Sequence, residues 1–195
     1  MVAVQHELTS RDRILAAARD LFVKHGFHQT SMAELAAEAH VSVGQIYRIF
    51  KDKAEVIDAI VRVDAEQRAR EMLLLRDRLL SGGLDITDAF EQLILKSMGR
   101  KDEALSYDIL AEGSRNRTVS ETIADMCMGY REILRDFACA ANRTLSGEAL
   151  DGAEEVILAC LFGLGHRSLS RPNLDETRTA KQGARMIVAA LRGMD

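Results

Sequence analysis

Several residue types that shape folds are scarce in this sequence. It has one proline, no tryptophan and three cysteines among 195 residues. Alanine, leucine, glutamate and arginine are common instead, and all four favour helices. No segment shows the strict alternation of a half-buried strand, and no internal repeat is present. The sequence therefore predicts an all-α protein.

The cysteines exclude a disulfide scaffold. Cys127, Cys139 and Cys160 are odd in number and contain no closely spaced CxxC pair. Such a pattern favours a reducing compartment, so we expect a cytoplasmic protein. These cysteines could act as a thiol sensor. Alternatively, they could be small apolar residues buried in the core.

Long apolar runs are also absent. No stretch reaches the length needed to span a bilayer, so we expect no membrane association. The first 13 residues have no apolar core before a cleavage site, which argues against a secretory signal. The apolar share of 47% and the charged share of 29% are typical of a globular protein.

Signatures of catalysis and cofactor binding are missing. The sequence has no GxGxxG, P-loop, HExxH or GxSxG motif. Only His166 and the pair Tyr107 and Glu112 are candidates for chemistry, so we expect no enzyme and no cofactor. His25 and His28 are three residues apart beside a glycine, but they lack further ligands at suitable spacing, so we expect no metal site.

The net charge of −4 is distributed unevenly. Residues 1–53 carry about one excess positive charge and four of the five histidines, while the remainder carries an excess of five negative charges. A weakly basic head on an acidic body is compatible with local phosphate binding. It argues against non-specific coating of nucleic acid, which requires many phosphate contacts.

Residues 30–53 form the most informative stretch. Ser31 with Glu34 is a capping box that starts one short helix, and Ser42 can cap a second helix from Val43 to Phe50. Helix, brief turn and helix is the layout that places a short helix in the DNA major groove. The alternative is a helical hairpin inside an ordinary bundle.

The side chains of this stretch separate by face. Val41, Ile46 and Phe50 share the side that packs on the first helix. The opposite side carries groups suited to base edges and phosphates. The predicted DNA-binding residues are Thr30, Ser31, Ser42, Val43, Gln45, Tyr47, Arg48, Lys51 and Lys53.

The first quarter of the chain resembles the DNA-binding domain of the TetR family of bacterial repressors. Two positions depart from the family pattern: His40 stands where glycine is usual, and Ile49 stands where a polar residue often contacts phosphate. The matching residues are Ile14, Ala17, Ala18, Leu21, Phe22, Gly26, Phe27, Thr30, Ser31, Met32, Leu35, Ala36, Ala39, Val41, Ser42, Gly44, Ile46, Tyr47, Phe50 and Lys53.

The resemblance implies about nine helices and two functional parts. Residues 1–53 would form a three-helix helix-turn-helix head, and residues 54–195 a ligand-binding and dimerisation body. A long helix from about Lys53 to Leu80 would join them. The implied function is a repressor that a small molecule releases from a palindromic double-stranded DNA operator. The alternative is a helical ligand-binding or scaffold protein whose helix-turn-helix no longer reads DNA.

The body contains candidates for an effector pocket. Few buried charges are expected there, which favours an uncharged or lipophilic effector, although Arg115 or His166 could meet an anion. The predicted ligand-binding residues are Phe90, Leu93, Tyr107, Leu110, Met126, Tyr130, Phe137 and Phe162. Plain core packing is the alternative for each of them.

The last two helices are predicted to form a homodimer interface. Residues 156–165 are apolar on all sides, which requires burial or a partner. Ala180, Gly183 and Ala184 lie on one face of the final helix and allow close helix approach. In the resembled family the last two helices form a two-fold four-helix interface. The alternative is that both helices complete the core of a single subunit.

Overall fold

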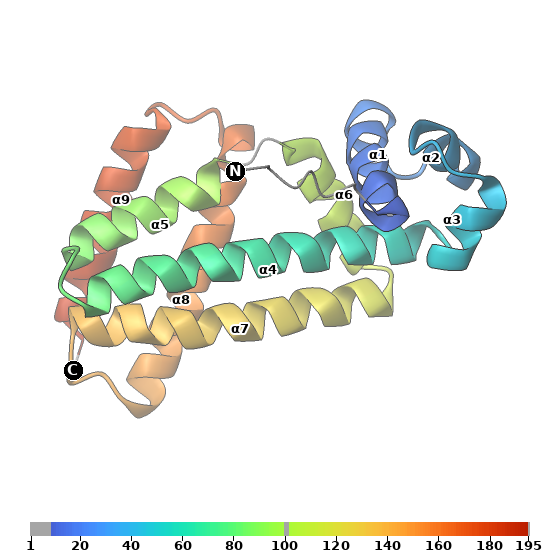
Figure 1. Cartoon of the computed structure of the whole chain (residues 1–195). Coiled ribbons are helices and arrows are strands. Elements are labelled where there is room, and N and C mark those ends of the chain that lie inside the picture. Colours follow the sequence, from blue (N-terminus) through green and yellow to red (C-terminus); the bar gives the residue numbers. More distant parts are fainter. Residues whose placement is uncertain (1–8, 100–101, 195) are drawn as a thin grey trace, which may run out of the picture. The chain divides into compact units, whose positions relative to one another are not determined.

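The computed structural model describes residues 9–99 and 102–194, and the regular structure in these ranges is entirely helical (Figure 1). The all-α prediction is therefore confirmed. No helix in the described ranges is both long and apolar enough to span a bilayer. The helices are α1 (Ser10–His25), α2 (Met32–Glu38), α3 (Val43–Ile49), α4 (Lys53–Leu80), α5 (Ile86–Met98), α6 (Glu103–Gly113), α7 (Arg117–Ala141), α8 (Gly147–Gly165) and α9 (Glu176–Arg192), with a 3₁₀ turn at Arg167–Ser170.

Side-chain caps fix where several helices begin. Thr9 and Ser31 each accept a hydrogen bond from the backbone N–H three residues on, and the acidic residue at that position bonds back to the cap. Asp85 and Asp175 each cap with a single bond: the Asp85 side chain accepts from Thr87 N–H, and the Asp175 side chain accepts from Arg178 N–H. These bonds satisfy N–H groups that have no partner inside the helix. The helix starts predicted at Ser31 and Ser42 are confirmed.

The packing of the chain divides it into two compact units. The first unit contains the described residues up to Asp64 together with Asp102–Ala124. The second unit contains the described residues of two segments, Ala65–Lys101 and Asp125–Asp195. The first unit therefore includes the first half of α4, all of α6 and the start of α7. A functional boundary between residues 53 and 54 remains a prediction, because packing alone does not define where a function ends.

The first unit has its own apolar core. Its largest fully buried side chains come from α1 to α4 and include Phe22, Leu35, Ile46 and Ile57. Leu105 from α6 belongs to the same cluster, which explains why α6 packs with the head. A three-helix head buries little apolar surface alone, so these additional helices enlarge a core that would otherwise be marginal.

Polar contacts tie α4 to its neighbours inside the first unit. Arg19 of α1 forms a bidentate ion pair with Asp64 of α4. The buried Thr122 hydroxyl of α7 donates to Asp58 and accepts from Arg62 at 2.6 Å. The first half of α4 is thus bonded to both α1 and α7.

The second unit is built around α5. Phe90 of α5 and Phe137 of α7 are fully buried and meet edge to face, with ring centroids 5.7 Å apart. Gly183 lets α9 approach α5 closely, because a Cβ there would lie 3.0 Å from Ile94 Cδ1. The small-residue face of α9 is thus used inside the subunit, whereas we had assigned it to a dimer interface. A partner would have to use a different face of α9.

Candidate nucleic-acid interface

The corner between α2 and α3 adopts a glycine-type conformation at His40. Its φ is +53°, its N–H donates to Ala37 O at 3.1 Å, and the N–H of Val41 donates to Ala36 O at 2.9 Å. These two bonds form a Schellman motif, which normally has glycine at this position. The departure from the family pattern at His40 is therefore a real conformational cost, since a side chain disfavours the left-handed region.

α3 is capped at one end and held on one side. Ser42 Oγ accepts a hydrogen bond from Gln45 N–H at 3.1 Å. Ile46 is fully buried and Phe50 is 4% exposed, so both anchor α3 to the core of the first unit, and Arg11 lies over the Phe50 ring. The predicted inner face of this helix is confirmed for these two residues.

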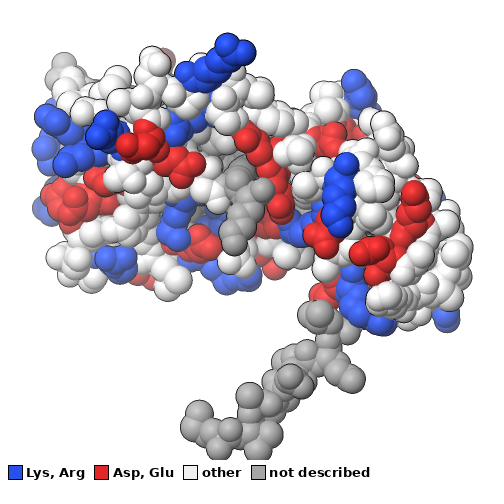
Figure 2. Space-filling view, turned by 90° about the horizontal axis from the view of Figure 1, so that it is seen from above, with Lys and Arg blue, Asp and Glu red and all other residues white. Residues whose placement is uncertain are grey.

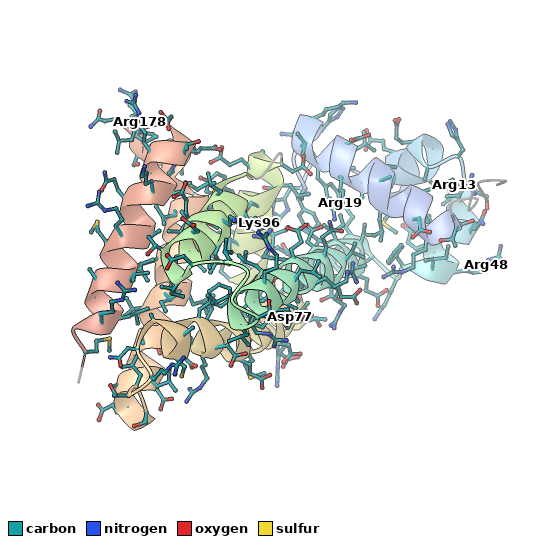
Figure 3. All side chains as sticks on the ribbon, turned by 60° about the vertical axis from the view of Figure 1, so that its left-hand side comes forward. Arg13, Arg19, Arg48, Asp77, Lys96 and Arg178 are labelled. Carbon is teal, nitrogen blue, oxygen red and sulfur yellow. The ribbon has the colours of Figure 1, made fainter. Side chains whose placement is uncertain are left out.

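The opposite side of α3 is open. Val43 is 50% exposed and Tyr47 is 53% exposed, which is unusual for large apolar and aromatic side chains on so short a helix. Arg48 is also exposed and projects away from its helix (Figure 3). The three side chains form one outward surface with Ser42 and Lys51, which are exposed too. Hydroxyl, guanidinium and ammonium donors around an aromatic ring are suited to a nucleic-acid backbone and base edges.

Two of the predicted contact residues, Thr30 and Lys53, have other partners. Thr30 is only 2% exposed, and its hydroxyl donates to Gly26 O at 3.0 Å, so its side chain is not on the outward surface as we expected. Lys53 Nζ donates to Phe27 O at 2.6 Å and to His28 O at 3.0 Å. Desolvation by burial lowers the pKa of Lys53. The sequence indicated two phosphate-binding groups at these positions, whereas the structure gives both a local role in the α1–α2 turn.

Gln45 and Ser31 are also engaged, though less completely. Gln45 is half-buried and its Nε2 donates to Ser10 Oγ at 2.8 Å. Ser31 is exposed, but its Oγ accepts the α2 capping bond from Glu34 N–H at 3.2 Å. Gln45 would have to release Ser10 before it could read a base. Ser31 retains its hydroxyl proton for donation to a phosphate.

Gly44 belongs to the outward surface, although we did not include it among the site residues. A Cβ added there would meet no heavy atom within 4 Å, so the fold does not require glycine. Glycine in a helix costs stability relative to alanine. Its use in α3, beside Val43 and Arg48, leaves the helix backbone accessible to a large partner. A destabilising glycine on a short exposed helix is thus a signal in the sequence that could have identified this site residue.

On the face seen in Figure 2, acidic and basic side chains are interspersed. That face therefore offers no wide positive field to a nucleic acid.

The predicted ligand-binding residues separate into four groups, of which Met126 and Tyr130 are the last. Phe90, Leu93 and Phe137 are close-packed in the core of the second unit. Tyr107 and Leu110 lie on α6 within the first unit, and the Tyr107 hydroxyl donates to Glu103 Oε1 at 3.2 Å. Phe162 is 37% exposed on α8 and packs on His166. For the first group the structure supports the core-packing interpretation.

Met126 and Tyr130 line a groove between α4 and α7 in the second unit. The groove has a volume of about 540 Å³. The Tyr130 hydroxyl donates to Ala65 O of α4 at 3.3 Å. A salt bridge of 3.5 Å between Arg76 and Asp136 spans the two helices further along. The two helices run parallel here, as Figure 1 also shows.

The sequence and fold match a known family of regulators. Residues 14–60, which contain α2, α3 and most of α1, match the family described as "Bacterial regulatory proteins, tetR family". This part of the chain is similar to the DNA-binding domain of that family. The predicted resemblance is thereby confirmed, and it includes the outward surface of α3.

Curated proteins that are similar to this chain are named as regulators. The HTH-type transcriptional regulator UidR of Escherichia coli (strain K12) is 32% identical over 129 residues, which span 64% of this chain and 62% of that protein. The match therefore covers less than two thirds of the relative.

Solved structures show the same fold along nearly the whole chain. Salmonella enterica GusR has a TM-score of 0.69 at 23% identity and covers 96% of this chain and 97% of its own. A transcriptional regulator from Pseudomonas aeruginosa PAO1 has a TM-score of 0.75 at 19% identity, covering 93% and 89%. At these identities the structural likeness supports the fold.

Proposed function

We propose that this protein is a transcriptional repressor that binds a near-palindromic operator in the cytoplasm as a homodimer. The observation that carries this proposal is the outward surface of α3, where Val43, Tyr47 and Arg48 are exposed on a helix that Ile46 and Phe50 hold in place. A rigid helix with exposed donors on one face meets the geometric need of major-groove recognition.

The roles of the side chains follow from their partners. Arg48 and Tyr47 have the reach to contact base edges or phosphates, and Lys51 is an exposed cation beside them. The hydroxyls of Ser31 and Ser42 stand at helix N-termini and donate to phosphate oxygens. Gly44 permits close approach of the duplex backbone. Thr30 and Lys53 act indirectly, because they hold the α1–α2 turn in place.

The homodimer is proposed to use α8 and α9. Val156 is 62% exposed and Phe162 37% exposed on α8, and Met186 is 71% exposed on α9. Ala159 and Cys160 are exposed near them. An apolar surface of this kind is costly in water and is explained by a second copy of the chain. A two-fold dimer would present two copies of α3 to successive major grooves, about 34 Å apart.

Release from the operator is proposed to depend on a small-molecule effector. α4 is one continuous helix from Lys53 to Leu80, so a displacement of its second half also acts on its first half. Its first half is bonded to α1 through Arg19 and Asp64. The effector shifts the protein away from its DNA-binding state only if it binds the other state more tightly.

The proposal is tested by selection from fragmented bacterial genomic DNA with the full-length protein. We expect one enriched, near-palindromic sequence. Tyr47→Ala should bind that sequence about tenfold more weakly. Leu74→Ala removes an exposed apolar side chain from the other unit and should bind normally. If no sequence is enriched, the protein is a helical ligand-binding or scaffold protein instead.

A further inference from the structure

The groove between α4 and α7 has an apolar floor. Ala69 and Leu73 come from α4, and Met126, Tyr130 and Ile133 come from α7. Ile133 and Tyr130 are each only 6% exposed, so the floor is continuous with the core of the second unit. A volume of about 540 Å³ is within the range of small-molecule sites.

A glycine lines this groove without any packing reason for its presence. Gly129 lies in the middle of α7 and lines the groove, and a Cβ built there would meet no heavy atom within 4 Å. Alanine would therefore fit and would favour the helix by about 0.5–1 kcal/mol. Neither a turn nor a close helix contact explains glycine at this position. The missing side chain leaves space over the apolar floor.

The rim of the groove is strongly acidic. Glu66, Asp125, Glu132 and Asp136 line it, against the single cation Arg76. Arg76 is already committed, because it pairs with Asp77 at 2.8 Å and with Asp136 at 3.5 Å. Within the described parts of the chain, Asp125 and Glu132 form no ion pair.

We propose that this groove binds an organic cation with an apolar body. The apolar floor would take the body, and Asp125 and Glu132 would face the positive charge. Glu66 pairs with Arg70 at 3.8 Å, but an anion of the same shape would still face the carboxylates of Asp125 and Glu132. This inference rests on the effector part of the proposed function and gives that effector a positive charge, where the sequence had favoured an uncharged or lipophilic molecule.

The proposal is tested with two probes of the same shape and opposite charge. Full-length protein is titrated calorimetrically with tetraphenylphosphonium and, separately, with tetraphenylborate. We expect the phosphonium to bind at least about tenfold more tightly than the borate. Asp125→Asn and Glu132→Gln should each weaken phosphonium binding about two- to fivefold, as expected for partly exposed charge pairs. Higher salt should weaken it too.

A second variant locates the site. Gly129→Leu fills the groove and should weaken phosphonium binding more than about tenfold. Circular dichroism checks that this variant is folded, and Glu91→Gln removes a carboxylate on α5 that does not line the groove and should bind as wild type does. Equal or tighter borate binding, absence of phosphonium binding, or unchanged binding by Gly129→Leu and the two charge variants would each overturn the proposal.

Operator binding is measured separately, without probe. If the protein binds phosphonium through this groove but selects no DNA, the cation site is supported and the proposed repressor function is contradicted. If the protein selects an operator but fails the probe tests, the repressor function is supported and the cation site is contradicted. The two failures are therefore distinguishable.

Discussion

Asp108 and Lys53 hold the two backbone polar groups of the same residue, Phe27. The Asp108 carboxylate of α6 accepts a hydrogen bond from Phe27 N–H at 2.9 Å, and Lys53 Nζ at the start of α4 donates to Phe27 O at 2.6 Å. Lys53 Nζ also lies 4.8 Å from the centre of the Phe27 ring. The turn between α1 and α2 is thus held from both sides by charged groups from other helices of the first unit.

Loss of the Asp108 carboxylate should destabilise the first unit. Asp108→Ala leaves the Phe27 N–H without its acceptor, at a cost of about 1–2 kcal/mol for a partly buried charged hydrogen bond. Asp108→Asn keeps an acceptor oxygen and should lose less. Urea unfolding followed by circular dichroism measures both. Equal stability of Asp108→Ala and wild type would show that this bond does not hold the turn.

His40→Gly should stabilise the protein. The residue has φ +53°, and glycine removes the steric cost of that conformation at a smaller entropic cost. We expect a gain of about 0.5–1 kcal/mol in the free energy of unfolding. His40→Ala keeps a Cβ in the left-handed region and is the matched control without a gain. A variant with glycine that is less stable than the alanine variant contradicts the strain argument.

Met186→Lys should dissociate the proposed dimer. The side chain is 71% exposed on α9, and a charge there would have to be desolvated at an apolar interface. Sedimentation equilibrium should give twice the mass of one chain for wild type and a lower average mass for the variant. Leu74→Lys, at an exposed apolar position on α4, should remain dimeric. If the Met186→Lys variant dimerises with unchanged affinity, the interface does not include this face of α9.

The capping box of α2 should contribute stability that depends on pH. Hydrogen bonds from the Ser31 backbone and side chain lower the pKa of Glu34 below its ordinary value of 4.5. Because the folded pKa is the lower one, the contribution is present above 4.5 and is lost as the pH falls through the folded value. Glu34→Gln should therefore lose less thermal stability than wild type between pH 6 and about pH 3.

Glu38→Gln is the control for this titration. It removes an exposed carboxylate from the other end of α2, beyond the capping box. Its loss of thermal stability on acidification should resemble that of wild type. Identical acid sensitivity in Glu34→Gln and Glu38→Gln would exclude a special role for the Glu34 carboxylate.

Local signals predicted the helices well. The caps at Ser31 and Ser42 and the spacing of Ile46 and Phe50 involve neighbours in the sequence, so they could be identified from the chain alone. The orientation of α3 followed from the same spacing. His40 was identified as a departure by comparison with the family pattern, and the structure gives it a positive φ.

Side chains with distant partners were predicted less well. Lys53 was predicted to bind phosphate. The sequence does not show that its ammonium group bonds to the carbonyl oxygens of Phe27 and His28, which lie 26 and 25 residues earlier in the chain. Gln45 contacts Ser10 across 35 residues, and periodicity carries no information about such a contact. From the sequence, Phe90 and Phe137 could equally line a pocket or pack in the core. The packing of α5 against α7 in the structure decides between these two interpretations.

The salt dependence of operator affinity tests the central claim that α3 of a paired molecule is presented to DNA. Affinity of the selected operator should be measured from about 50 to 200 mM salt for wild type, Arg48→Ala and Lys51→Ala. Each variant removes one phosphate contact per subunit, so the slope of log affinity against log salt should become shallower by about 2 per dimer. Slopes and affinities equal to those of wild type in both variants would contradict the account.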